Sequence, residues 1–150
     1  MEGDTLELGT FGAVVKFALE LEAMAAAFYE TASAITSTEQ LKIPFEAYIQ
    51  KRLLRMETLK RLRRENTTEM ILEPIHGLQD EDYRVKSECP EGCPDEELLK
   101  LASQLEERNQ KFYQDAAKKI EFLIEPADIF ERFAEENGDN AQSIQKIKSS

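Results

Sequence analysis

The chain has 150 residues, a length that suits one domain with a sizeable core. Apolar residues make up 41% and charged residues 33%, and six glycines and five prolines are too few for a turn-rich β sandwich. The net charge of −11 argues against a general nucleic-acid binder, because the phosphate backbone would be repelled.

Neither the opening segment nor the first predicted helix has the pattern of an export signal or of a membrane span. The opening "MEGDTLELGT" is acidic and lacks the positive n-region of a secretory signal. The most apolar window, "FGAVVKFALELEAMAAAFY", contains Lys16, Glu20 and Glu22 and makes a poor membrane span. We therefore expect a cytoplasmic protein that does not contact membranes.

Four helices are predicted in chain order, over residues 8–35, 40–65, 95–120 and 126–148. Ser37 and Thr38 can cap the second helix, and Pro94 and Pro126 suit the starts of the third and fourth. The stretch "NTTEMILEPIHGLQDEDYRVKSECPEGCP" has no long helical period. The pattern predicts an all-α four-helix bundle, one domain over 1–150, with one long crossover between its second and third helices.

The sequence also repeats itself. "ALELEAMAAAFYETA" (18–32) aligns with "ASQLEERNQKFYQDA" (102–116) at an offset of 84. "FEAYIQKRLLRMETLKRL" (45–62) aligns with "FERFAEENGDNAQSIQKI" (130–147) at an offset of 85. Two helix pairs built on one pattern predict approximate internal two-fold symmetry.

The predicted inward stripe of each helix is apolar at both ends and polar near its middle. If the helices pack in register, these middles meet in one layer. Its members would be Glu22, Arg52, Arg55, Glu106, Asn109, Asn137 and Asn140.

The paired "LE…FYETA" and "LE…FYQDA" segments, the phenylalanines that open the second and fourth helices, and "GLQDEDY" in the crossover resemble rubrerythrin-type members of the ferritin-like superfamily, from about residue 10 to 148. The resemblance implies a ferritin-like bundle whose di-iron site takes a lone Glu from each of two helices and Glu-x-x-His from the other two. Glu22 and Glu106 match the lone glutamates. The remaining positions carry other residue types: Arg52, Arg55, Asn137 and Asn140.

This departure from the family pattern changes the expected chemistry. A guanidinium has no lone pair for a metal, and an asparagine carbonyl is a weak ligand. We expect no catalytic residue and no cofactor, with bidentate ion pairs of Arg52 and Arg55 to the two glutamates in place of the metals. In this hypothesis the amides of Asn137 and Asn140 satisfy the remaining hydrogen bonds, and the hydroxyls of Tyr29 and Tyr113 are satisfied in the core.

Two observations leave alternatives open at this layer. Carboxylates next to the layer in the sequence could hold a displaced metal: Glu20, Glu107, Glu135, Glu136 and Asp139. Most of them are expected to point away from the layer, because a one-residue step turns a side chain by about 100° around a helix. The pair Asn137-Gly138 is typical of a turn, and a break there would misalign the fourth helix.

The expected function is a non-catalytic binding, scaffold or regulatory bundle, formed as a homodimer. One alternative is a rubrerythrin-like di-iron protein, either a peroxide-reducing oxidoreductase or an iron-handling protein, that uses atypical ligands. Another is an anion or small-ligand site lined by Arg52 and Arg55.

Two further motifs stand apart from the layer. "KRLLRMETLKRLRR" (51–64) has seven basic residues and one acid, which indicates a solvated face or a docking face for an acidic partner at Lys60, Arg61, Arg63 and Arg64. "CPEGC" holds Cys89 and Cys93, which are too few for a rubredoxin-type iron centre. They could form a local disulfide, contribute half of an intersubunit metal site with His76, or have no function.

Overall fold

The computed structural model describes residues 6–66, 74–86, 88–89 and 92–148. Four long helices make up most of this part: α1 (Phe11–Ile35), α2 (Glu39–Glu65), α3 (Asp95–Lys119) and α4 (Ile124–Lys148). The described residues form no β-strand; a single isolated bridge joins Glu7 to Gln79. The predicted all-α four-helix bundle is confirmed.

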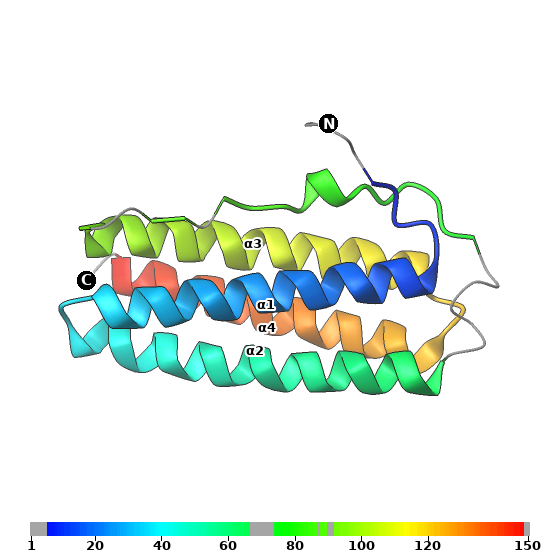
Figure 1. Cartoon of the computed structure of the whole chain (residues 1–150), viewed down its shortest axis with the longest axis horizontal. Helices are drawn as coiled ribbons and strands as arrows, with labels where there is room; N and C mark the ends of the chain where they lie inside the picture. The colour runs from blue at the N-terminus through cyan, green and yellow to red at the C-terminus, as the bar shows by residue number, and fades with distance from the viewer. Residues whose placement is uncertain (1–5, 67–73, 87, 90–91, 149–150) are drawn as a thin grey trace.

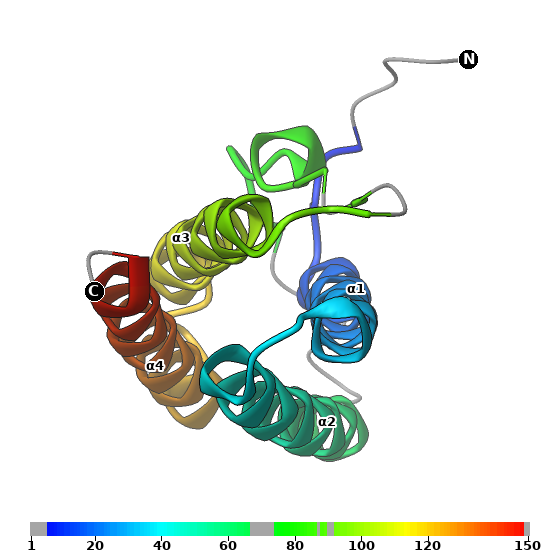
Figure 2. The ribbon, with the colours of Figure 1, turned by 90° about the vertical axis from the view of Figure 1, so that its left-hand side faces the viewer.

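The helices pack as two pairs, α1 with α2 and α3 with α4 (Figure 1). The view along the bundle places the four helices around a common centre (Figure 2). Residues 74–86 of the connection between α2 and α3 run along the bundle and lie outside α1 and α3. They include the short 3₁₀ helix η2 (Asp80–Asp82).

The crossover is anchored by apolar side chains and by a few hydrogen bonds. Ile75, Leu78 and Tyr83 are buried in the apolar core. The Tyr83 ring packs edge-on against Phe112 of α3, with ring centroids 5.3 Å apart, and the Tyr83 hydroxyl donates to Asp115 at 2.8 Å. These contacts fix the crossover to the outer side of α3.

The helix N-termini differ from the prediction in their caps. Thr10, which we did not single out, caps α1: its hydroxyl accepts a hydrogen bond from the Ala13 N–H at 3.1 Å. Thr38 occupies the N-cap of α2, but its side chain makes no capping hydrogen bond. Pro94 is the N-cap of α3 and is followed by three acidic residues, which favour the positive end of the helix.

Helix α4 continues without a break through Asn137 and Gly138, so reading this pair as a turn is wrong. A Cβ atom at position 138 would lie 2.6 Å from Nε2 of Gln110, which is the far end of a flexible side chain of α3. The uninterrupted helix keeps Asn137 and Asn140 in register with the other three helices.

The apolar core consists of two clusters, one toward each end of the bundle. One contains Phe11 and Leu21 of α1, Leu59 of α2 and Phe130 of α4. The other contains Tyr29 of α1 and further side chains of all four helices. Along every helix, the polar residues predicted to meet at mid-bundle fall between these two clusters. No helix in the described part of the chain combines the length and apolar character that a membrane span requires.

Candidate functional site

The layer between the two apolar clusters holds charged and amide side chains that are buried away from water. We call it the polar layer, and its members are Glu22, Arg52, Arg55, Glu106, Asn109, Asn137 and Asn140. Both glutamate side chains have no exposed surface, and that of Arg52 is 1% exposed. Asn140 lies half-buried at the edge of the layer. All four helices contribute, because the inward-facing stripe of each helix becomes polar at the same height along the bundle.

Arg52 lies between the two glutamates. Its Nη1 donates to Oε1 of Glu22 at 3.0 Å and to Oδ1 of Asn109 at 2.8 Å, while its Nη2 donates to Oε2 of Glu106 at 2.8 Å. One guanidinium therefore bridges the carboxylates of α1 and α3. This differs from the predicted bidentate pairs, because each carboxylate receives only one nitrogen of Arg52.

Arg55 lies one turn further along α2 and points toward α4. Its Nη1 donates to Glu22 at 3.4 Å and to Asn137 at 3.3 Å, and its Nη2 donates to the Phe133 carbonyl at 2.9 Å and to Glu136 at 3.0 Å. The guanidinium also lies 4.6 Å from the centre of the Phe133 ring. Its buried Nε finds no acceptor among the described residues.

Each of the two repeat tyrosines, Tyr29 and Tyr113, forms a hydrogen bond with the glutamate of the other repeat. The Tyr29 hydroxyl donates to Oε2 of Glu106, and the Tyr113 hydroxyl donates to Oε2 of Glu22, both at 2.5 Å. Tyr113 and Glu106 are the counterparts of Tyr29 and Glu22 at the offset of 84, so the two bonds are related by the internal two-fold symmetry. The structure thus gives both hydroxyls a partner.

The amides of α4 occupy the other oxygen of Glu106. Nδ2 of Asn137 donates to Oε1 at 2.8 Å, and Nδ2 of Asn140 donates to the same atom at 3.3 Å. Since Oε2 already accepts from Arg52 and Tyr29, both oxygens of Glu106 are fully engaged. The symmetry breaks here, because α2 offers two cations where α4 offers two neutral amides.

The protonation states follow from burial and from these contacts. Burial alone would raise the pKa of Glu106, but the charge of Arg52 and the hydrogen bonds from Tyr29, Arg52 and Asn137 hold it below its ordinary value. Burial would lower the pKa of Arg52, and the two carboxylates raise it well above the ordinary value. Burial, together with the neighbouring glutamate charges, raises the pKa of Tyr29 and of Tyr113.

The structure therefore brings all seven residues predicted for the layer together. Sequence reasoning missed that Glu136 pairs with Arg55, because Glu136 lies one residue away from the inward stripe of α4 and is half exposed. It also missed the reciprocal tyrosine bonds. The repeat carried a signal for them, since each tyrosine follows a glutamate by seven residues, which is about two helical turns.

The residues of the layer do not fit a di-iron site. The atoms that face both carboxylates are guanidinium N–H donors, and they lie at hydrogen-bonding distance from oxygens that would have to ligate the metals. Arginine stays protonated and offers no lone pair. Among the described residues, no three side chains of His, Cys, Asp or Glu are grouped so that they could hold a metal ion.

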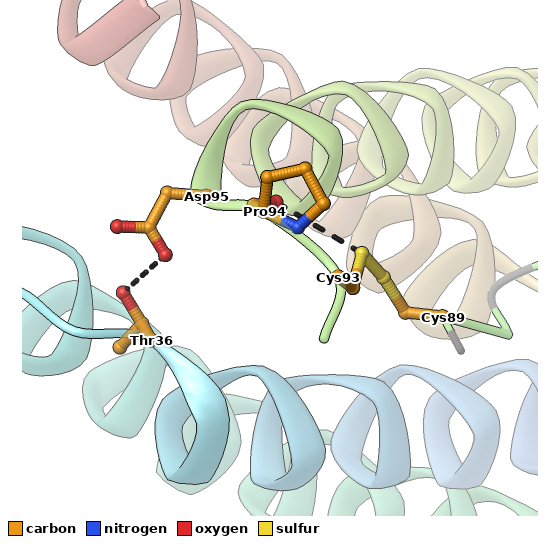
Figure 3. The surroundings of a disulfide bond; sticks show 5 residues. All are labelled: Thr36, Cys89, Cys93, Pro94 and Asp95. Atoms are coloured by element: carbon orange, nitrogen blue, oxygen red, sulfur yellow. Dashed lines mark hydrogen bonds between the residues drawn. A yellow bond between two sulfur atoms is a disulfide. The ribbon is translucent and has the colours of Figure 1, made fainter. Parts of the chain in front are cut away.

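The other sequence candidates lie outside the layer. Lys60 pairs with Glu57 at 3.4 Å, and Arg61 pairs with Glu65 at 2.7 Å and with Glu125 at 3.5 Å. Arg63 and Arg64 also have interaction partners. Cys89 and Cys93 are joined in a disulfide beside the start of α3 (Figure 3), while His76 is exposed.

Comparisons of the chain with models of protein families, with curated proteins and with solved structures found no match.

Proposed function

We propose that the chain is a rubrerythrin-type, ferritin-like bundle in which a buried ion-pair layer stands in place of a di-iron centre. In this proposal it acts in the cytoplasm as a non-catalytic binding, scaffold or regulatory protein. The observation that supports the proposal is the position of Arg52, which lies at 3.0 and 2.8 Å from the two glutamates at the family's lone-ligand positions.

The chemistry of the layer supports a structural role for these residues. Both oxygens of Glu22 and of Glu106 accept hydrogen bonds from side chains of the protein. A carboxylate in this state is not free to ligate a metal or to take a proton from a substrate. The remaining groups are guanidinium ions and neutral amides, which neither abstract protons nor change redox state at neutral pH.

Metal analysis tests this proposal. The chain would be purified without a histidine tag, incubated anaerobically with excess Fe²⁺, desalted and measured for iron by mass spectrometry. We expect no stoichiometric iron. About two irons per chain, accompanied by peroxide consumption with a reduced electron donor, would instead support the oxidoreductase or iron-handling alternative.

A designed variant supplies the matched positive control and tests the family assignment. Arg52→Glu, Arg55→His, Asn137→Glu and Asn140→His together restore the family's ligand set around Glu22 and Glu106. We expect this variant to bind about two Fe²⁺ per chain, because four carboxylates and two imidazoles then converge on the layer. A folded variant that binds no metal would show that these positions are not equivalent to the ligands of the family.

The anion-site alternative has one observation in its favour, the unpartnered Nε of Arg55. Against it, both terminal nitrogens of Arg55 and of Arg52 already donate to protein acceptors. Phosphate titrated into the protein separates the two cases. A melting temperature that rises with phosphate, and that no longer does so in Arg55→Gln, would support an anion site.

We also propose that the chain forms a homodimer through the outer face of α2. Ile43 and Leu54 are 63% and 68% exposed on this face, and Leu53 beside them is 43% exposed. The acidic-partner alternative places an acidic protein at Lys60 and Arg61, which form exposed pairs with acids of their own chain.

A further inference from the structure

A cavity of about 650 Å³ lies on the side of α1 that faces the end of the crossover. Its lining is mostly apolar and includes Met24, Ala27, Phe28, Cys89 and Leu98. We call it the α1 groove. None of these lining residues belongs to the polar layer.

Cys89 lines the α1 groove and is joined to Cys93 in a disulfide. The sulfur-bearing residues are both half-buried and pack against the apolar cluster that contains Phe28 and Leu98. Their Cα atoms are 5.7 Å apart. Cys93 directly precedes Pro94, the N-cap of α3, so the disulfide joins the end of the crossover to the start of α3 (Figure 3).

The position of the disulfide indicates that it contributes little to the stability of the fold. The bond spans a sequence separation of only 4, and the stabilisation from a disulfide grows with the loop it closes. The start of α3 is held independently, because Asp95 accepts a hydrogen bond from Thr36 at 2.8 Å (Figure 3). It also accepts one from Ser37 at 3.5 Å. Opening the bond would therefore release residue 89 from the groove while α3 stays in place.

We propose that Cys89 and Cys93 form a reversible redox site that is reduced by a dithiol, and that the redox state sets the shape of the α1 groove. Part of the reasoning rests on the cytoplasmic location proposed above, since disulfides in that compartment are usually transient. Cys89 and Cys93 are only half-buried, so we expect a small thiol to reach the bond, as it could not in a fully buried disulfide.

The reduction is a two-step exchange. A thiolate of the external dithiol attacks one sulfur of the pair, the bond between Cys89 and Cys93 breaks, and the released cysteine leaves as a thiolate that takes up a proton. The second thiol of the reductant then attacks the mixed disulfide and frees the other cysteine. Two electrons and two protons pass to the protein, and the reductant leaves as a cyclic disulfide.

Alkylation of the native full-length chain tests the redox step. Since the sequence has two cysteines, every free thiol that is detected belongs to this pair. The protein would be treated with dithiothreitol without denaturant, alkylated with N-ethylmaleimide and weighed by intact mass spectrometry. We expect no alkyl group before reduction, two after it, unchanged helical circular dichroism, and recovery of the unmodified mass when glutathione disulfide is added before the maleimide.

The NMR signals of the methionine methyl groups test whether the α1 groove changes shape. Met24 lines it, whereas Met56 lies on α2 and provides the control. With ¹³C-labelled methionine methyl groups, we expect the Met24 signal to move on reduction while the Met56 signal stays in place. The double variant Cys89→Ser/Cys93→Ser should show the moved Met24 signal permanently and should not respond to dithiothreitol.

Several outcomes would overturn the proposal. Thiols that react before reduction would mean that the pair is not oxidised in the protein. Alkylation that requires denaturant, or reduction that abolishes the helical signal, would make the disulfide structural. Alkylation of both thiols without movement of the Met24 signal would show that the redox state of the pair does not change the groove. None of these results depends on the metal content of the polar layer.

Discussion

At the centre of the bundle, one guanidinium joins carboxylates that come from two different helices. Arg52 contacts Glu22 of α1 and Glu106 of α3, and all three side chains are buried. An exposed ion pair is worth at most about 1 kcal/mol, because water screens it. A buried pair behaves differently: removing one partner leaves the other charge without compensation, which costs about 3–5 kcal/mol.

We therefore expect Arg52→Ala to lower the free energy of unfolding by about 3–5 kcal/mol, measured by urea denaturation at neutral pH. The matched control is Lys51→Ala. Lys51 is the preceding basic residue on the same helix and is exposed, so its removal should change stability by less than about 0.5 kcal/mol. Equal effects of the two substitutions would mean that the layer contributes no more than surface charge does.

The lowered pKa of Glu106 predicts a specific dependence on pH. A carboxyl group whose pKa is lower in the folded state than its ordinary value of 4.5 stabilises the fold above that value, and the stabilisation is lost as the pH falls through the folded pKa. Urea midpoints measured from neutral pH into the acid range should decline for the natural protein. In Glu106→Gln the decline should be smaller, and the gap between the two proteins should narrow in acid. A constant gap at every pH would show that the Glu106 charge does not contribute.

At the scale of the helices, Gly138 lies inside α4, where glycine is an unfavourable residue. Replacing it with alanine should gain up to about 1 kcal/mol from helix propensity. The added methyl group would meet only the far end of the flexible Gln110 side chain, which can rotate away. We expect Gly138→Ala to raise the thermal midpoint.

Gln110→Ala is the control for this experiment, because it removes the atom that the new methyl group would meet. The double variant should be at least as stable as Gly138→Ala alone. If Gly138→Ala is strongly destabilising and Gln110→Ala does not rescue it, the backbone of α4 itself requires the glycine.

The sequence predicted the helices well because their apolar positions recur with the helical period, and it placed the polar layer because two helix pairs repeat one pattern. The helix predicted over 126–148 does continue through Asn137-Gly138; only the alternative of a turn at this pair is wrong, since the local turn preference is outweighed by the rest of the helix and its packing against α3. Sequence reasoning also missed the cap at Thr10. Such a cap depends on the backbone conformation just before the first turn of α1, and periodicity does not report that conformation.

The details of the polar layer were less predictable than its composition. Charge counting led to two bidentate glutamate–arginine pairs, whereas the structure gives a bridge from Arg52 to both glutamates, and Arg55 pairs with Glu22 and also with Glu136. Which carboxylate an arginine reaches depends on the rotation and the axial height of each helix. A long side chain also reaches residues that lie off the inward stripe. These distances come from packing and cannot be read from spacing along one helix.

At the scale of the whole molecule, the proposed dimer would pair two copies through the outer face of α2. Two copies that pair antiparallel about a point between Leu53 and Leu54 would bring these leucines together. The same two-fold relation places Glu46 of one copy opposite Arg61 of the other, since both lie at equal distances from that point. An isologous interface requires such a match of a surface with itself.

We expect light scattering after size exclusion to give twice the mass of one chain. Leu54→Lys, at the centre of the face, should weaken the dimer at least tenfold, because two buried lysines would meet at the axis. The matched control is Ile124→Lys, which adds the same charge at an apolar residue that is 80% exposed at the start of α4 and should leave the dimer intact. Glu46→Arg should weaken the dimer, and adding Arg61→Glu should restore it. A monomeric natural protein, or equal dissociation by the two lysine substitutions, would contradict the α2 interface, whereas failure of the charge swap alone would contradict only the antiparallel register.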